Sequence, residues 1–132
     1  MSTKRKKYKA YNDFLLPDYI YVKIRYEASL YNKYKEQLKS LQNSSFSLHI
    51  NNYDEIVANK IDLEKRINII EKCKLTVKRE YREAVFESLT TKKTNEEIKN
   101  KYLLPDISFK YEKRKFIYFL AAEHGLNFHK NS

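Results

Sequence analysis

The sequence predicts an all-α protein, and three observations support that prediction. Only one Gly and two Pro occur among the 132 residues, too few for the many tight turns of a sheet protein. The composition is instead rich in Lys, Glu, Leu and Ile. Apolar residues also recur three and four positions apart through most of the chain, which is the spacing of amphipathic helices. We therefore expect an N-terminal helical arm followed by a C-terminal helical domain.

The charge balance indicates a polyanionic partner. Lys and Arg number 27 against 17 Asp and Glu, so the formal net charge is 27 − 17 = +10. Double-stranded DNA is the expected partner of such a chain. The single Cys73 cannot form an intrachain disulfide, which favours a cytoplasmic location. No apolar run approaches the roughly 20 residues that cross a bilayer, so no membrane partner is expected.

The N-terminal third is predicted to contain a tail, an arm and a linker. Residues 1–16 carry a run of cations and are expected to be a disordered basic tail. Residues 17–42 are the arm, with one helix over 18–42 whose apolar positions are Leu30, Tyr34, Leu38 and Leu41. Its first part, YIYVKIRY, also alternates in the way of a short strand, and the helix is favoured. Residues 43–53 have no period and are rich in Asn and Ser, so they are predicted to be a linker.

Residues 54–126 are predicted to be a helical DNA-binding domain. Asp54 can cap a helix over 54–74, and a second helix is expected over 76–89. Thr94 followed by Glu97 is a capping-box pattern that starts a short helix over 95–102. Pro105 ends that helix and suits the first turn of the next, predicted over 106–124. A helix-turn-helix at 94–124 follows from this pattern.

The interior of this motif is predicted from apolar spacing. Leu104 and Phe109 fall six and eleven residues after Ile98, the spacing expected when a helix-turn-helix closes on itself. Three positions depart from the usual motif, because Lys99, Leu103 and Pro105 replace a small residue, a Gly and a Ser. The residues expected to be mutually buried are Ile98, Leu104, Phe109, Phe116 and Leu120.

The opposite face of the second helix is predicted to contact DNA. Lys and Arg suit phosphates and guanine edges, and Tyr suits phosphates and thymine methyls. Residues near the helix start are expected to reach bases and later ones to reach phosphates. The alternative is an ordinary solvated face, which the basic excess makes less attractive. The predicted DNA-binding residues are Asp106, Ile107, Ser108, Lys110, Tyr111, Lys113 and Arg114.

The order of segments resembles a family of phage regulators. The chain is similar to phage transcriptional regulators of the RinA, LtrC and ArpU type. Three segments together carry the resemblance: LYNKYKEQLKSLQ, KIDLEKRINIIEKCKLTVKREYREAVFESL and TNEEIKNKYLLPDISFKYEKRKFIYFLAAEHG. The resemblance covers residues 26–126 and is one of pattern more than of identities. It implies a C-terminal helix-turn-helix like region 4 of sigma factors, activation of late packaging and structural genes, and RNA polymerase as a further partner.

Catalysis and metal binding are not expected. The carboxylate pairs at Glu96 with Glu97 and at Glu80 with Glu83 are explained by capping and by ordinary helix surfaces. His124 and His129 flank Gly125, but a left-handed glycine cap at a helix end explains this pattern more simply than a metal. No enzyme activity and no cofactor are predicted.

Two other functions remain open at this point. A small terminase subunit also combines a helix-turn-helix with long helices, and would assemble into rings on DNA. A helical interaction module could instead bind an acidic protein partner. The arm carries more apolar surface than a free helix shows to water, so we expect it either to fold back on residues 54–90 or to form a homodimer.

Overall fold

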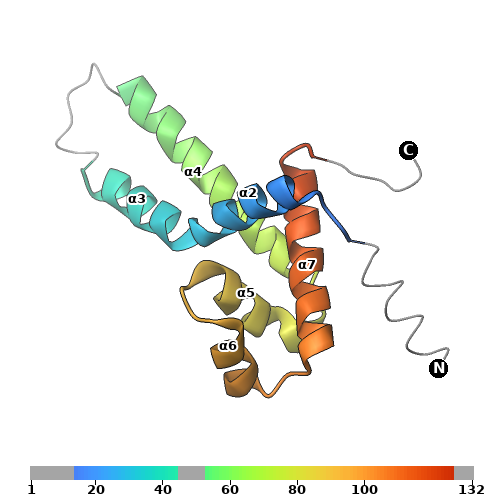
Figure 1. Cartoon of the computed structure of the whole chain (residues 1–132). Helices are drawn as coiled ribbons and strands as arrows, with labels where there is room; N and C mark the ends of the chain where they lie inside the picture. The colour runs from blue at the N-terminus through green and yellow to red at the C-terminus, as the bar shows by residue number, and fades with distance from the viewer. Residues whose placement is uncertain (1–13, 45–52, 127–132) are drawn as a thin grey trace, which may run out of the picture.

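The computed structural model describes residues 14–44 and 53–126, and every regular element in these two ranges is helical (Figure 1). The all-α prediction is confirmed. The helices are α2 (Asp18–Ser29), α3 (Tyr31–Ser44), α4 (Tyr53–Lys74), α5 (Arg82–Thr90), α6 (Asn95–Tyr102) and α7 (Asp106–Glu123), with a 3-10 turn, η2 (Arg79–Tyr81), before α5. Residues 1–13 of the predicted tail and 45–52 of the predicted linker lie outside the described residues.

The arm consists of two helices, where the sequence predicted one. At Leu30 the backbone has φ −86° and ψ 0°, and its N–H is bonded to the carbonyl of Glu27 as well as to that of Ala28. This tightened last turn ends α2, and α3 starts in a new direction one residue later. No Pro or Gly marks the bend. Its cause is tertiary, because α2 crosses α7 and α5 whereas α3 follows α4.

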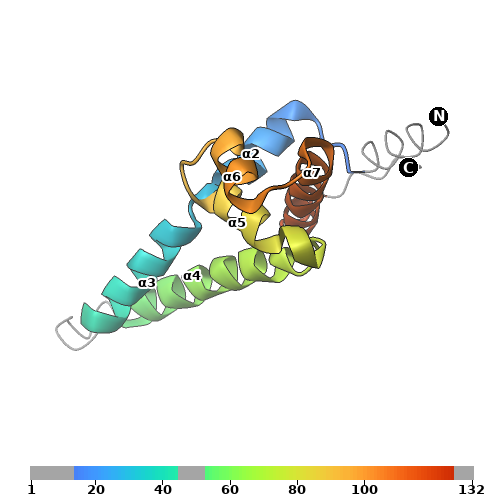
Figure 2. The same cartoon turned by 90° about the horizontal axis from the view of Figure 1, so that it is seen from below.

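Helices α3 and α4 form an antiparallel hairpin that projects from the rest of the molecule (Figure 2). Tyr34 and Leu63 are buried between them, and Leu38 and Leu41 pack partly against this core. At the base of the hairpin, Glu27 of α2 accepts hydrogen bonds from the Tyr34 hydroxyl at 2.7 Å and from Arg66 at 3.1 Å. The arm therefore folds back on the scaffold, one of the two predicted arrangements.

The main core lies where α2, α5 and α7 meet the C-terminal half of α4. Several of its side chains are fully buried: Ala28, Ile70, Ala84, Val85, Phe116, Ile117 and Leu120. Small residues in α2 and α5 let these helices approach closely, and the Phe and Ile side chains of α7 fill the space between them. Helix α7 is thus the element against which α2, α4 and α5 all pack.

The described chain starts with packed residues, which corrects the predicted extent of the tail. Leu16 is buried, and the ring of Phe14 lies against the rings of Tyr111 and Tyr118 on α7. Apolar side chains in this position leave water when they pack, which explains why they belong to the fold. Residues 14–16 of the predicted tail therefore belong to the fold.

Candidate nucleic-acid interface

Helix α6 begins with the predicted capping box. The Thr94 hydroxyl accepts the N–H of Glu97 at 3.2 Å, and the Glu97 carboxylate accepts the N–H of Thr94 at 3.2 Å. Two backbone donors that a helix start leaves open are thereby satisfied. The predicted helix bounds, 95–102 and 106–124, agree with α6 and with α7 to within one residue.

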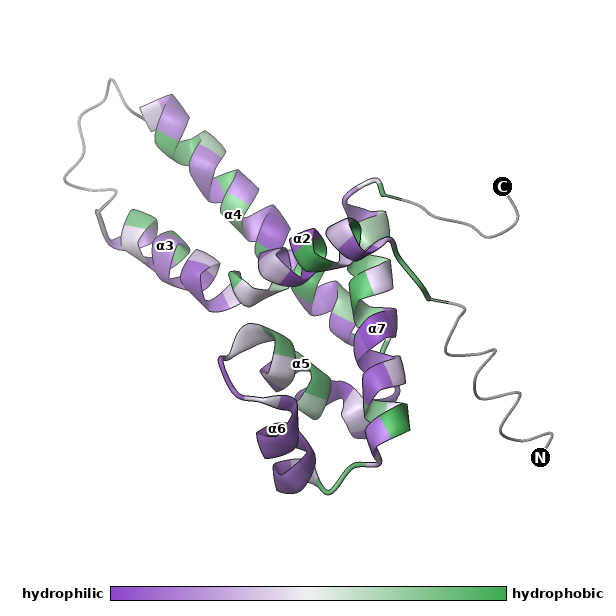
Figure 3. Ribbon diagram, in the orientation of Figure 1, coloured by the Kyte–Doolittle hydropathy of each residue, from purple (hydrophilic) through white to green (hydrophobic). Residues whose placement is uncertain are grey.

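The turn from α6 to α7 contains one residue in the left-handed region. Leu103 has φ 55° and ψ 52°, and its N–H bonds to the carbonyl of Lys99. A glycine would adopt this conformation without strain, whereas a residue with a Cβ pays roughly 1–2 kcal/mol. Pro105 follows with φ −64° and precedes the first residue of α7. The Leu103 side chain is 87% exposed, and the apolar turn stands out beside the hydrophilic α6 (Figure 3).

Lys99 braces this turn with two ion pairs. Its ammonium lies 2.6 Å from the Asp106 carboxylate and 2.9 Å from that of Glu96. These contacts raise the pKa of Lys99, and the pairing with Lys99 and then with Lys110 lowers the pKa of Asp106. A lysine is accommodated at the position of the usual small residue because its ammonium forms an ion pair that links α6 to the first residue of α7.

The predicted interior is largely observed. Ile98, Phe109, Phe116 and Leu120 are fully buried. Leu104 is only half-buried and packs at the edge of the core, so the predicted mutual burial holds only in part for this residue. Its place in the turn, beside the left-handed Leu103, holds it near the surface.

The seven predicted DNA-binding residues do not share one exposed face. Asp106, Ile107 and Lys110, in the first two turns of α7, are exposed, and Ile107 is 54% exposed. Ser108, Tyr111 and Arg114 are half-buried, and Lys113 is buried.

Lys113 points inward, contrary to the prediction. It is 5% exposed, its ammonium donates to the Asn95 side-chain oxygen at 2.8 Å, and it lies 5.9 Å from the centre of the Phe109 ring. Burial, and secondarily the charge of Arg25, lowers its pKa to about 8. The spacing could have revealed this position, because residue 113 lies four after Phe109 and three before Phe116. Its ammonium cannot serve as a phosphate contact in this arrangement.

The arm covers the later turns of α7. The guanidinium of Arg114 lies 5.6 Å from the centre of the Tyr21 ring of α2, and Phe14 stacks edge-on against Tyr118 at 5.3 Å. Sequence spacing predicted an open face for Arg114. The prediction missed the arm because periodicity within one helix does not show which neighbouring helix will pack on it. The exposed Asp106, Ile107 and Lys110 of the first two turns are not covered in this way.

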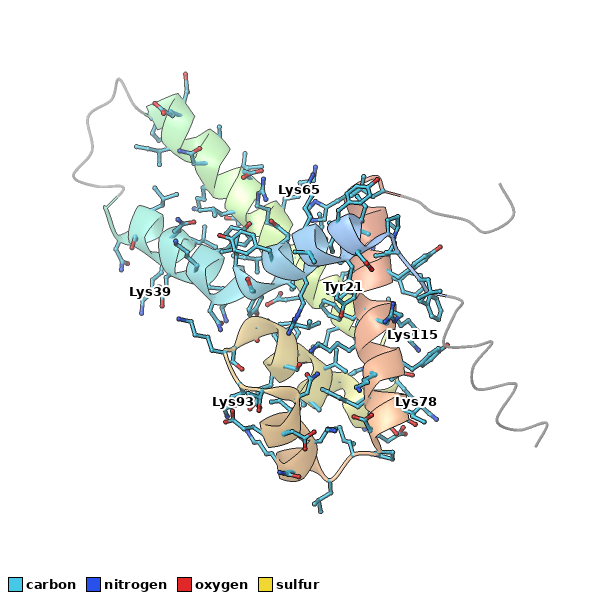
Figure 4. The ribbon with its side chains drawn as sticks, in the orientation of Figure 1. Tyr21, Lys39, Lys65, Lys78, Lys93 and Lys115 are labelled. Atoms are coloured by element: carbon cyan, nitrogen blue, oxygen red, sulfur yellow. The ribbon has the colours of Figure 1, made fainter. Side chains whose placement is uncertain are left out.

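Two lysines next to this open segment were not predicted. Lys115 lies 5.5 Å from the centre of the Tyr111 ring, and its ammonium pairs with Glu112 at 2.9 Å. Glu112 is buried and also accepts the backbone N–H of Lys78 at 2.8 Å. Lys78 and Lys115 lie on the same side of α7 (Figure 4). No local pattern joins residues 78 and 115, so only the tertiary fold could reveal the pair.

Glu87 holds α5 and α6 together behind this surface. Its carboxylate accepts hydrogen bonds from Lys93 at 2.7 Å, Lys101 at 2.9 Å and the Tyr102 hydroxyl at 2.7 Å. These three donors, in that order, lower the pKa of Glu87 to about 2. Helix α6, which leads into α7, is therefore tied to α5.

The described metal-ligating side chains and the single thiol are further candidate parts of a site. No group of three metal-ligating side chains occurs in ranges 14–44 and 53–126. Burial raises the pKa of Cys73 to about 12, so its thiol stays protonated at neutral pH. Gly125 has φ 79°, as expected of a left-handed helix cap, whereas His129 lies outside the described ranges. None of the described helices combines the length and apolar character of a membrane span.

Comparisons with protein families, with curated proteins and with solved structures found no match to this chain. What the surface around α7 can bind therefore has to be inferred from its own geometry and charge.

Proposed function

We propose that this protein is a DNA-binding transcriptional regulator that presents the first two turns of α7 to the major groove. The observation that carries this proposal is the contrast along α7. Its start is open and tied to α6 by the Lys99–Asp106 ion pair, whereas its later turns are covered by α2 and Phe14. A helix offered by its N-terminal end is the usual way in which a helix-turn-helix reaches base edges.

The exposed residues supply the chemistry that base reading needs. Lys110 can donate to a guanine edge or a phosphate, and Ile107 and Leu103 can contact thymine methyl groups. Lys78, which is exposed at the side of α7, can contact a phosphate, whereas the Lys115 ammonium is held in its ion pair with Glu112. Asp106 is assigned a bracing role, because its carboxylate is paired with Lys99 and Lys110 and would repel phosphate if it were free. Lys113 is withdrawn from the proposed interface.

The resemblance to phage late-gene regulators gives the proposal a biological setting. In it, the protein activates packaging and structural genes, and RNA polymerase is the second partner. This part rests on the resemblance alone.

The decisive experiment compares Lys110→Ala with Lys39→Ala on promoter-containing and random duplexes. Lys39 is exposed on α3, at the side of the molecule away from α7 (Figure 4), and its replacement removes the same charge. Lys110→Ala is expected to weaken binding to the cognate duplex by about 5- to 150-fold, corresponding to about 1–3 kcal/mol, and to weaken random DNA much less. Equal effects of the two replacements on cognate DNA would contradict base reading by α7.

A second candidate function is supported by the surface of α2. Tyr19, Val22 and Tyr26 form an exposed stripe at helical spacing, and Arg25 lies beside it. A stripe of this kind suits an amphipathic protein partner with acidic residues. A double variant in which Tyr19 and Tyr26 are both replaced by Ser separates the two functions. If α7 is the DNA interface, this variant should bind DNA as the unmodified protein does.

A further inference from the structure

A chain of ion pairs runs from α6 to the open turns of α7. The Asp106 carboxylate is shared by two lysines, because its Oδ1 lies 2.6 Å from the Lys99 ammonium and its Oδ2 lies 3.2 Å from that of Lys110. The Lys99 ammonium is also paired with Glu96 at 2.9 Å, and the Lys99 side chain is only 16% exposed. The position of the Asp106 carboxylate is therefore set by a lysine that is itself held in place.

Asp106 is ionised in this position. The hydrogen bond from Lys99, and then that from Lys110, lowers the pKa of Asp106 below its ordinary value. Asp106 is also the first residue of α7, where the helix dipole favours a negative charge. An ionised carboxylate only accepts hydrogen bonds, and the Lys110 ammonium only donates them. The two side chains thus present one acceptor beside one donor.

Both groups are accessible although they are paired. The side chains of Lys110 and Asp106 are 50% and 45% exposed. An ammonium has three donors and a carboxylate has several lone pairs, so the contact between them leaves hydrogen-bonding capacity on each. Their separation of 3.2 Å also matches the major-groove edge of a base pair, where a donor on one base lies about 2.9 Å from an acceptor on the other.

A G·C base pair suits this arrangement better than an A·T pair. Guanine presents two neighbouring acceptors, O6 and N7, to the Lys110 ammonium, and cytosine presents its N4 amino donor to the Asp106 carboxylate. In an A·T pair the adenine amino donor stands between the two acceptors, N7 and O4, so one ammonium reaches only one of them. The donor and the acceptor on α7 are therefore both best satisfied by G·C.

The charges of this chain of ion pairs supply discrimination more than attraction. Two lysines and two acidic residues take part, so the four charges cancel. A lysine alone can bind any phosphate, whereas a carboxylate beside it repels phosphates and accepts only from a donor on a base edge. The Asp106–Lys110 pair is thus suited to distinguish base pairs rather than to hold DNA of any sequence.

From this geometry we infer that Asp106 and Lys110 together read one G·C base pair in the major groove, with Lys99 as the positioning residue that orients Asp106. Lys110 donates to guanine and Asp106 accepts from the cytosine amino group. The inference rests on the proposed function and deepens it, because Asp106 keeps its bracing contact with Lys99 and gains a contact with a base.

Selection from a randomised duplex pool, followed by sequencing of the bound fraction, tests the inference on the full chain. Asp106→Asn and Lys110→Gln change the two proposed readers, and Lys99→Met removes the positioning contact. Asp62→Asn is the matched control, because Asp62 also pairs with a cation four residues later, Arg66 at 3.0 Å, on the projecting α3–α4 hairpin (Figure 2). Thermal unfolding establishes that each variant is folded at the temperature of selection, and binding to a random-sequence duplex is measured separately.

The unmodified protein is expected to prefer G·C at one position by about 5- to 150-fold, the value of one good pair of base contacts. Asp106→Asn should lose most of this preference and, because it removes a negative charge, bind random-sequence DNA about 1.5- to 5-fold more tightly. Lys110→Gln should lose the preference at the same position while binding random DNA more weakly. Lys99→Met should reduce the preference, and Asp62→Asn should keep it.

Several results would overturn the inference. An Asp106→Asn variant that keeps the preference, or that binds the selected and the random duplex equally more weakly, would show that Asp106 is only a brace. Loss of preference at different positions in Asp106→Asn and Lys110→Gln would exclude a shared base pair. If Asp106→Asn does not fold, an unchanged G·C preference in Lys110→Gln or in Lys99→Met has the same force. Failure of the unmodified protein to select any sequence would instead overturn the proposed function itself.

Discussion

Lys110 and Lys113 lie three residues apart on α7, yet one is exposed and the other is buried. Lys110 belongs to the open first two turns and pairs loosely with Asp106 at 3.2 Å. Lys113 belongs to the covered part, where it donates to Asn95 and its pKa falls to about 8. A basic residue on a helix is therefore evidence of a ligand-binding face only when the packing of that helix is known. In α7, the covered turns belong to the core, and the open turns are the part proposed to bind DNA.

The largest expected difference between the two parts of α7 concerns stability. Replacing the fully buried Phe116 by Ala leaves a cavity among α2, α5 and α7, and should lower the free energy of unfolding by about 3–5 kcal/mol. Replacing the exposed Ile107 by Ala should change it by less than about 0.5 kcal/mol. Chemical denaturation of both variants measures the contrast. A cost below about 1.5 kcal/mol for Phe116 would mean that the later turns of α7 are not the centre of the fold.

The next effect is a pH dependence of stability that the buried Lys113 produces. The pKa of Lys113 falls from an ordinary value of 10.5 to about 8, so its cationic form is disfavoured by folding. This cost, up to about 3 kcal/mol, is fully present below pH 8 and disappears as the pH rises from about 8 to 10.5. Lys113→Met removes the charge and loses about 1 kcal/mol through the bond to Asn95. We therefore expect this variant to be more stable than the unmodified protein at pH 7 by about 1–2 kcal/mol.

Denaturation at several pH values checks this expectation. The advantage of Lys113→Met should shrink between pH 8 and 10 and then reverse. Lys110→Met is the control for the loss of one exposed lysine charge. A constant difference between Lys113→Met and the unmodified protein would show that the burial of this ammonium has no energetic consequence.

A smaller effect on stability is expected at the capping box that begins α6. Thr94→Ala removes the hydroxyl of the capping box and should cost about 1 kcal/mol. Thr91→Ala is the control, because its hydroxyl donates to the Glu87 carbonyl in an exposed position and should contribute less than about 0.5 kcal/mol. Thermal unfolding of the two variants side by side would reveal whether the cap matters more than an ordinary surface hydroxyl.

The sequence predicted α6 and the start of α7 because the signals there are local. Thr94, Glu97 and Pro105 act on the backbone within four residues of themselves, and each lies where the pattern required. Three other features depend instead on contacts between distant helices. They are the bend at Leu30, the burial of Lys113, and the hydrogen bond from the backbone N–H of Lys78 to the Glu112 carboxylate. Periodicity can place a side chain on a face of its own helix, but it cannot tell which other helix will cover that face. The role of α7 in DNA binding stays a prediction.

The smallest expected effect lies in the turn that joins the two short helices. Leu103→Gly relieves roughly 1 kcal/mol of left-handed strain, but it also gives the unfolded chain more conformational freedom, worth about 0.4–1 kcal/mol. The net result should be a change between zero and about 0.5 kcal/mol in favour of the folded state. Leu103→Ala keeps the strain and removes the same exposed side chain beyond Cβ, so it isolates the backbone effect and should be less stable than the Gly variant.

If Leu103 also contacts a thymine methyl, both replacements weaken cognate DNA binding equally while their stabilities differ. Equal stabilities of the Gly and Ala variants would mean that the backbone at residue 103 carries no strain, and that the turn does not depend on a left-handed residue there.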